Sequence, residues 1–238
     1  MRDDAVAIVP AGGQSRRLAG WVGAGGKAAL AVDGESLLGR VCRVLAAEVS
    51  RVIVVTAAGR VLPELPPGVE VIFDRDPGQG PLPAIRDGLA HATTIAGPPP
   101  RVAVLAACDL ARLEPVIVQR LIEGVGEAGC RWVVPVVAGH PQVLLSALAV
   151  DCLPLVERAA RAGHLSLRQL VAELSAAEPT AVRLIGEAEL EGCRVDLASL
   201  ADIDTPAQLR GIRGESGDDN PGLNATGLNA LALDGSEG

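Results

Sequence analysis

A glycine-rich stretch near the N-terminus, "AGGQSRRLAGWVGAGGKAAL" (residues 11–30), contains Lys27, the only lysine in a chain with 21 lysine and arginine residues. Glycines let backbone N–H groups approach phosphate oxygens closely. A lysine ammonium acts as a point charge on one phosphate, whereas arginine favours a planar grip on two oxygens. The stretch therefore predicts a phosphate-binding loop. Its expected nucleotide contacts are Ala11, Gly12, Gly13, Ser15 and Lys27, and Arg17 adds positive charge.

Two standard phosphate-binding motifs do not describe this loop. Ala28 follows Lys27 where the GxxxxGK(S/T) motif requires Ser or Thr, and the glycine spacing does not fit GxGxxG. An ordinary glycine-rich turn that holds a lysine by chance is therefore the alternative interpretation.

Asp109 directly follows the apolar run "VAVLAAC". A carboxylate at the end of a buried strand costs stability unless it is paired or binds a cation. Mg²⁺ is commonly held by one or two carboxylates together with substrate phosphates. We therefore expect Asp109 to bind Mg²⁺, with Asp204 of "ADIDTP" as a second ligand. The alternatives are that Asp109 lies at the start of the helix after Glu114 and that Asp204 caps the last helix.

A third polar loop, "DPGQGPL" (residues 76–82), contains two glycines that make its backbone accessible to a ribose or a base edge. Asp76, Gly80 and Pro81 are its expected nucleotide contacts. A plain connecting loop is the alternative.

Apolar runs that alternate with helical patterns must position these loops. The expected strands are 5–11, 51–57, 69–74, 101–109, 132–138, 142–150 and 181–186, and the expected helices are 35–48, 81–93, 115–128, 152–163, 165–176 and 205–212. This order predicts an α/β fold with a single, mostly parallel sheet and helices on both faces. Because ligands of such sheets bind beyond the carboxyl ends of the strands, the three loops are expected at one edge.

Composition excludes several classes of function. The net charge is −8, which argues against duplex binding, and the aromatic content of 1% leaves few platforms for base stacking. No apolar run reaches the ~18 residues of a membrane span, and the N-terminus lacks a signal-peptide layout, so we expect a cytoplasmic protein. The cysteines form no CxxC or Cys/His cluster, and we expect them to be small core residues.

The chain divides by composition into two parts. Residues 1–213 carry the alternating pattern and are expected to form one domain, a monomer or a weak homo-oligomer. Residues 214–238 carry acidic side chains but no basic ones, and they are polar and repetitive. We expect them to form a disordered acidic tail.

The three loops together resemble a known family. "AGGQSRR" followed by a lysine is similar to the motif LAGGxSxRMGxDK of the MobA-like nucleotidyltransferases, the molybdenum cofactor guanylyltransferase family. "DPGQGPLPAI" and "AVLAACDLARL" are similar to its PGxGPLAGI segment and its strand ending in CDMPxL. Further along, "GHPQVLLSAL", "RAGHLSLRQLV" and "ADIDTPAQL" look like its HPL strand, its GxRSLRxLL helix and its NTPEDL close. The resemblance covers about residues 5–212.

The resemblance implies a Rossmann-like nucleotidyltransferase that uses Mg²⁺, a nucleoside triphosphate and a phosphorylated small-molecule acceptor. GTP and molybdopterin are the favoured pair, and Lys27, Arg17 and Asp109 take the catalytic roles. Transfer of CMP, transfer to a sugar phosphate or phospholactate, and a non-catalytic nucleotide-binding homologue are the alternatives. The chain departs from the motif at Gly26, which replaces an Asp, and in the longer spacer before Lys27.

Overall fold

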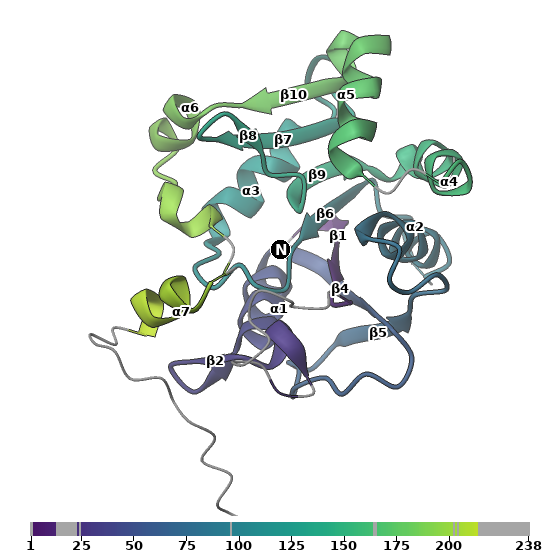
Figure 1. The fold of residues 1–238 in the computed structure, drawn as a ribbon. Helices are drawn as coiled ribbons and strands as arrows, with labels where there is room; N and C mark the ends of the chain where they lie inside the picture. The colour runs from purple at the N-terminus through teal and green to yellow at the C-terminus, as the bar shows by residue number, and fades with distance from the viewer. Residues whose placement is uncertain are drawn as a thin grey trace, which may run out of the picture.

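The computed structural model describes residues 2–12, 23, 25–95, 97–163, 166–201, 203 and 205–213, and the expected acidic tail lies outside them. The described strands form an eight-stranded sheet in the order β10-β7-β9-β6-β1-β4-β5, with β8 beside β7 (Figure 1). The strands are β1 (Arg2–Pro10), β4 (Val49–Thr56), β5 (Val69–Phe73), β6 (Val102–Ala106), β7 (Trp132–Val137), β8 (His140–Pro141), β9 (Leu145–Ala149) and β10 (Val182–Ile185).

The sheet is mostly parallel, as the alternating pattern predicts. β5, β4, β1 and β6 run parallel to one another, and so do β7 and β10. β9 is antiparallel to both β6 and β7. The expected strand 142–150 therefore begins three residues late and reverses direction, and the expected strand 101–109 ends at Ala106. Cys108 and Asp109 thus lie in the loop after β6 rather than in the strand.

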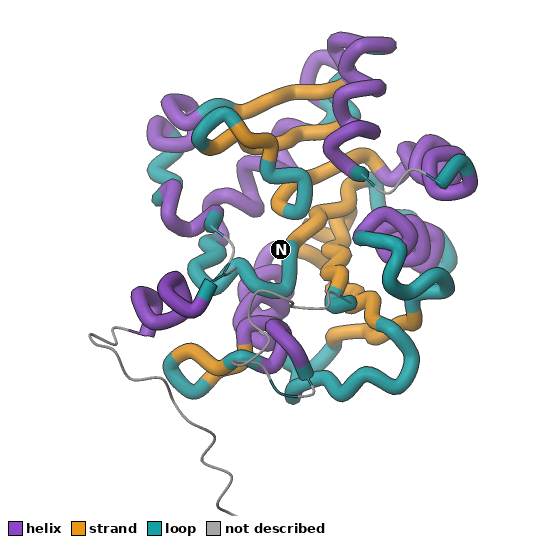
Figure 2. The backbone as a smooth tube through the Cα atoms, in the orientation of Figure 1, coloured by secondary structure: helices purple, strands orange, loops and turns teal. Residues whose placement is uncertain are grey.

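Helices cover both faces of the sheet, which confirms the predicted fold class (Figures 1 and 2). α1 (Leu37–Glu48), α3 (Pro115–Gly124) and α6 (Glu187–Gly192) contribute to the core on one face. α2 (Pro81–Ala92), α4 (Leu153–Arg161) and α5 (Leu167–Ala177) contribute to the core on the other. No described helix is long and apolar enough to cross a bilayer.

A small hairpin and the last described helix pack together beside the loop that follows β6. β2 (Ala31–Val32) and β3 (Glu35–Ser36) are joined by Asp33 and Gly34, whose φ angles of +52° and +79° suit a tight hairpin turn. α7 (Pro206–Arg213) packs on this hairpin through a small apolar cluster. The cluster contains Leu30, Val32, Leu37, Ala111, Ile203 and Leu209.

One glycine sets how closely α2 approaches the sheet. A Cβ at Gly88 would lie 2.5 Å from Cγ2 of Ile8, a fully buried residue of β1. We expect Gly88→Ala to lower the free energy of unfolding by about 1–3 kcal/mol, because β1 or α2 must shift. Denaturant unfolding measures this loss. Gly211→Ala in α7 is the control, since a Cβ there meets no atom within 4 Å among the residues that the structure describes, and an equal loss in both variants would contradict the explanation.

Candidate functional site

The carboxyl ends of β1, β4, β5 and β6 lie at the same edge of the sheet because these strands are parallel neighbours. The loops that follow β1, β5 and β6 contain the three sequence-predicted groups of polar residues. The expected convergence of the three loops on one edge is therefore confirmed for their described parts.

The lone lysine and the strand-end aspartate form an ion pair. Lys27 lies in a short 3₁₀ segment, Gly26–Ala29, and Asp109 lies in the loop after β6. Lys27 Nζ donates to Asp109 Oδ2 at 2.9 Å, across 82 positions of sequence. The two side chains are only 16% and 10% exposed. The pair places one positive and one negative group side by side at the sheet edge, where both are shielded from bulk water.

Two glycines shape the backbone that presents Lys27. A Cβ at Gly25 would lie 2.4 Å from the Cβ of Ala29. Gly26 adopts a φ of +63°, in the left-handed region that favours glycine. Gly26 is the position where the similar family motif has an aspartate, so this departure accompanies a left-handed turn immediately before the lysine.

The C-terminal motif reaches the loop of Asp109. The backbone N–H of Ile203 donates to the carbonyl of Asp109 at 3.3 Å, and Ile203 packs with Ala111 in the small apolar cluster. The segment that contains the predicted second ligand therefore lies next to Asp109, although Asp204 itself lies outside the described residues.

Mg²⁺ is the metal ion that the sequence predicts at this site. Within the described part of the chain, no group of three or more His, Cys, Asp or Glu side chains could hold a metal ion. Asp109 offers one hard carboxylate, and Mg²⁺ needs only one or two such groups when phosphates and waters complete its shell. The residues therefore fit Mg²⁺ brought in with a nucleotide better than a metal caged by protein alone.

The structure describes residues 11–12, 23 and 25–30 of the first loop. The backbone N–H of Ala11 donates to the carbonyl of Val55 at 2.8 Å, so this N–H already serves the sheet. The expectation that the Ala11 N–H donates to a phosphate oxygen is therefore wrong. Gly12 is exposed, and a Cβ there would meet no atom of the described residues within 4 Å. Gly13, Ser15 and Arg17 lie outside the described residues.

The third loop connects β5 to α2. The backbone N–H of Asp74 donates to the carbonyl of Thr56 at 2.8 Å, which ties the start of the loop to β4. Gly78 and Gly80 both have a φ of +86°, and Pro81 is the first residue of α2, where its missing N–H costs nothing. The two glycines and the proline are therefore explained by the backbone turns of this exposed loop.

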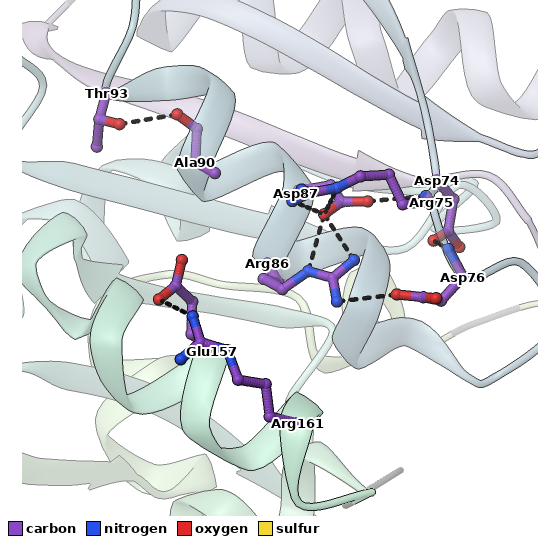
Figure 3. A network of polar contacts seen from close by, with 9 residues as sticks. All are labelled: Asp74, Arg75, Asp76, Arg86, Asp87, Ala90, Thr93, Glu157 and Arg161. Carbon is purple, nitrogen blue, oxygen red and sulfur yellow. Dashed lines mark hydrogen bonds and ion pairs between the residues drawn. The ribbon is translucent and has the colours of Figure 1, made fainter.

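Sequence reasoning missed a set of charged residues behind this loop. Asp87 of α2 is 5% exposed and accepts hydrogen bonds from Arg75 and Arg86 (Figure 3). Arg86 also pairs with Asp76, the predicted nucleotide contact, at 2.9 Å. The sequence feature that could have revealed this set is an aspartate among the apolar positions of a helix, because a buried carboxylate needs a hydrogen-bonding or charged partner.

Cys108, beside Asp109, does not offer a nucleophile. Burial raises the pKa of its thiol to about 12, and the charge of Asp109 adds to this rise, while Lys27 and Arg60 oppose it. Because the thiolate is the reactive form, Cys108 stays a neutral thiol at physiological pH. Cys42, Cys130 and Cys152 are buried, as expected for small core residues.

Comparison with known proteins gives a family match over most of the chain. The model of the MobA-like NTP transferase domain matches residues 7–178. A comparison with curated proteins gives no match.

Solved structures share the fold. Molybdopterin-guanine dinucleotide biosynthesis protein A from Archaeoglobus fulgidus is 22% identical, with a TM-score of 0.67, over 88% of this chain and 97% of its own. CMP:2-keto-3-deoxy-manno-octonic acid synthetase, complexed with CTP, is 17% identical, with a TM-score of 0.62, over 89% of this chain and 98% of its own. 2-C-methyl-D-erythritol 4-phosphate cytidylyltransferase from Thermus thermophilus is 18% identical, with a TM-score of 0.59, over 90% and 98%.

Proposed function

The chain belongs to the MobA-like NTP transferase family, and on that premise we propose that it transfers a nucleoside monophosphate from a nucleoside triphosphate to a phosphorylated acceptor. A phosphate oxygen of the acceptor attacks the α-phosphorus. The bond from the α-phosphorus to the bridging oxygen breaks, and pyrophosphate leaves. Such transfers ask the protein mainly for positioning and for charge stabilisation.

The observation that supports this function best is the shielded Lys27–Asp109 pair at the carboxyl edge of the sheet. A nucleoside triphosphate carries several negative charges and needs a cation close to its phosphates. Lys27 supplies that cation from a short segment whose glycines set its backbone. A phosphate that replaces Asp109 as the partner of Lys27 keeps the ammonium paired throughout binding.

The remaining roles follow from the resemblance to the family motifs and from the order of the residues in the sequence. Arg17 adds charge for the leaving pyrophosphate, and the backbone of Gly12 and Gly13, with the Ser15 hydroxyl, holds the phosphates. Asp76 and Gly80, from the loop before α2, and Pro81, at the start of α2, contact the nucleoside. Asp109, once separated from Lys27, is the carboxylate that would hold Mg²⁺, with Asp204 as the second candidate ligand. Bound Mg²⁺ would neutralise charge on the reacting phosphate.

GTP and molybdopterin are the substrates that we favour. The motifs "SLRQLV" and "DIDTPAQL" resemble the molybdopterin branch of the family, and the Archaeoglobus fulgidus structure is named for molybdopterin-guanine dinucleotide synthesis. Cytidylyl transfer to another acceptor is the second candidate, because two structures of similar fold are named for CMP or cytidylyl products.

The test is pyrophosphate release by the purified protein with Mg²⁺, each of the four ribonucleoside triphosphates and each candidate acceptor. We expect release with GTP and molybdopterin, dependent on both and abolished by a chelator. Release only with CTP would support the second candidate. Nucleotide binding without release in any combination would instead indicate a non-catalytic homologue.

A further inference from the structure

The charged residues behind the loop 74–80 form one connected network (Figure 3). Asp87 Oδ2 accepts the backbone N–H of Arg75 at 2.9 Å. Asp87 Oδ1 accepts Nε and Nη2 of Arg75 at 2.9 and 2.6 Å, and Nε of Arg86 at 2.8 Å. Arg86 Nη1 then pairs with Asp76 Oδ2 at 2.9 Å, and Asp74 Oδ1 accepts the backbone N–H of Asp76. A single buried carboxylate thus ties the loop to α2.

The parts of this network differ in exposure. The Asp87 side chain is 4% exposed and that of Arg86 is 15% exposed, whereas Arg75 and Asp76 are 67% and 43% exposed. Every residue from Pro77 to Gly80 is exposed. The loop itself therefore buries little apolar surface, and its shape depends on the polar contacts that Asp87 makes from inside.

Asp87 stays charged in this position. Burial alone would raise the pKa of Asp87, but hydrogen bonds from the Arg75 side chain and backbone and from Arg86 outweigh burial and hold the pKa below its ordinary value. A buried charge is expensive, and a well-packed apolar residue at such a site is often as stable or more so. The burial of Asp87 is therefore weak evidence that it serves stability alone.

We propose that Asp87 is a positioning residue that holds the loop 74–80 in its nucleotide-binding shape. This role rests on the proposed function, in which that loop contacts the nucleoside. Gly78 and Gly80 give the loop a large conformational freedom, and ordering it on binding would weaken affinity. A loop held in advance by Asp87 avoids this loss. The effect belongs to substrate binding, because Asp87 touches no reacting group.

Asp87→Asn tests the role, since it keeps the shape of the side chain and removes its charge. We expect KM for the nucleoside triphosphate to rise about 5- to 10-fold while kcat stays within about 2-fold. Hydrogen exchange of a peptide covering residues 74–82 should become at least about 10-fold faster, because the Arg75 amide loses its ionised acceptor. A purely structural role would lower the melting temperature and leave KM unchanged.

The matched control is Glu189→Gln. Glu189 also bridges two arginines, Arg120 and Arg183, each at 2.8 Å, but it does so on α6. KM should not change in this variant. If Asp87→Asn does not fold, Arg75→Gln is the variant that tests the role. It removes the hydrogen bonds from the Arg75 guanidinium to Asp87 and keeps the hydrogen bond from the Arg75 backbone N–H. It should raise KM about 2- to 3-fold.

The outcomes separate this role from the proposed function. A parent protein that binds no nucleoside triphosphate overturns the proposed function, and the role of Asp87 falls with it. A parent that binds and turns over, combined with unchanged KM and unchanged exchange in the Asp87 and Arg75 variants, overturns the positioning role alone.

Discussion

Replacing Asp109 by asparagine is expected to lower the rate of pyrophosphate release by about 100-fold or more. Asparagine keeps the size of the side chain but removes the charge that would hold Mg²⁺ at the reacting phosphate. It also removes the carboxylate that pairs with Lys27 at 2.9 Å. Steady-state turnover under saturating nucleotide and Mg²⁺ measures the loss.

The same substitution should also lower the free energy of unfolding. Removing the charge of a buried carboxylate that has no partner would stabilise the protein, but Asp109 is paired with Lys27 and nearly buried. The amide oxygen of asparagine can still accept from Lys27 but carries no charge, so the ion pair is lost, at a cost of about 1.5–3 kcal/mol at most. Denaturant unfolding measures this loss separately from turnover.

The control for Asp109→Asn lies at the opposite edge of the sheet. Glu70 of β5 pairs with Arg51 near the start of β4, at 2.8 Å. Glu70→Gln should leave turnover unchanged. If Asp109→Asn loses stability and keeps full turnover, the Lys27–Asp109 pair is structural and Asp109 is not the metal ligand.

The main features of the fold could be predicted from periodicity. Continuous apolar runs such as "RVAVLAA" are typical of buried strands, and the helices between them force parallel neighbours. The direction of β9 could not be predicted in this way, because an apolar run does not record which neighbour its strand pairs with. The helix α6 was missed because it is short and has one buried residue, Leu190.

The candidate site could be predicted in its parts but not in its pairing. Lys27 stood out as the only lysine and Asp109 as a charge after an apolar strand. Nothing in the sequence shows that these residues, 82 positions apart, form an ion pair. The network of Asp87 was harder still to predict, since arginines and aspartates in and next to an exposed loop usually lie on a solvated surface. The burial of Asp87 depends on how α2 packs, which is a tertiary property.

Replacing Lys27 by alanine is expected to lower nucleotide binding or turnover by about 10-fold or more, a loss of ~1.4 kcal/mol or greater. The variant removes the cation that offsets phosphate charge and leaves the shielded Asp109 carboxylate without its ammonium partner. Stability should fall as well, because the remaining charge is poorly solvated.

Lys27→Arg separates the two effects. Arginine can pair with Asp109, so stability should return close to that of the parent protein. Turnover should not return, because the planar guanidinium prefers to grip the carboxylate with two donors and presents a different geometry to a single phosphate oxygen. Arg51→Ala, which removes a cation from the matched pair at the opposite sheet edge, should change neither nucleotide binding nor turnover and so controls for net charge. Full activity in Lys27→Arg would show that any cation suffices, and full activity in Lys27→Ala would remove the lysine from the mechanism, leaving its pairing with Asp109 as its role.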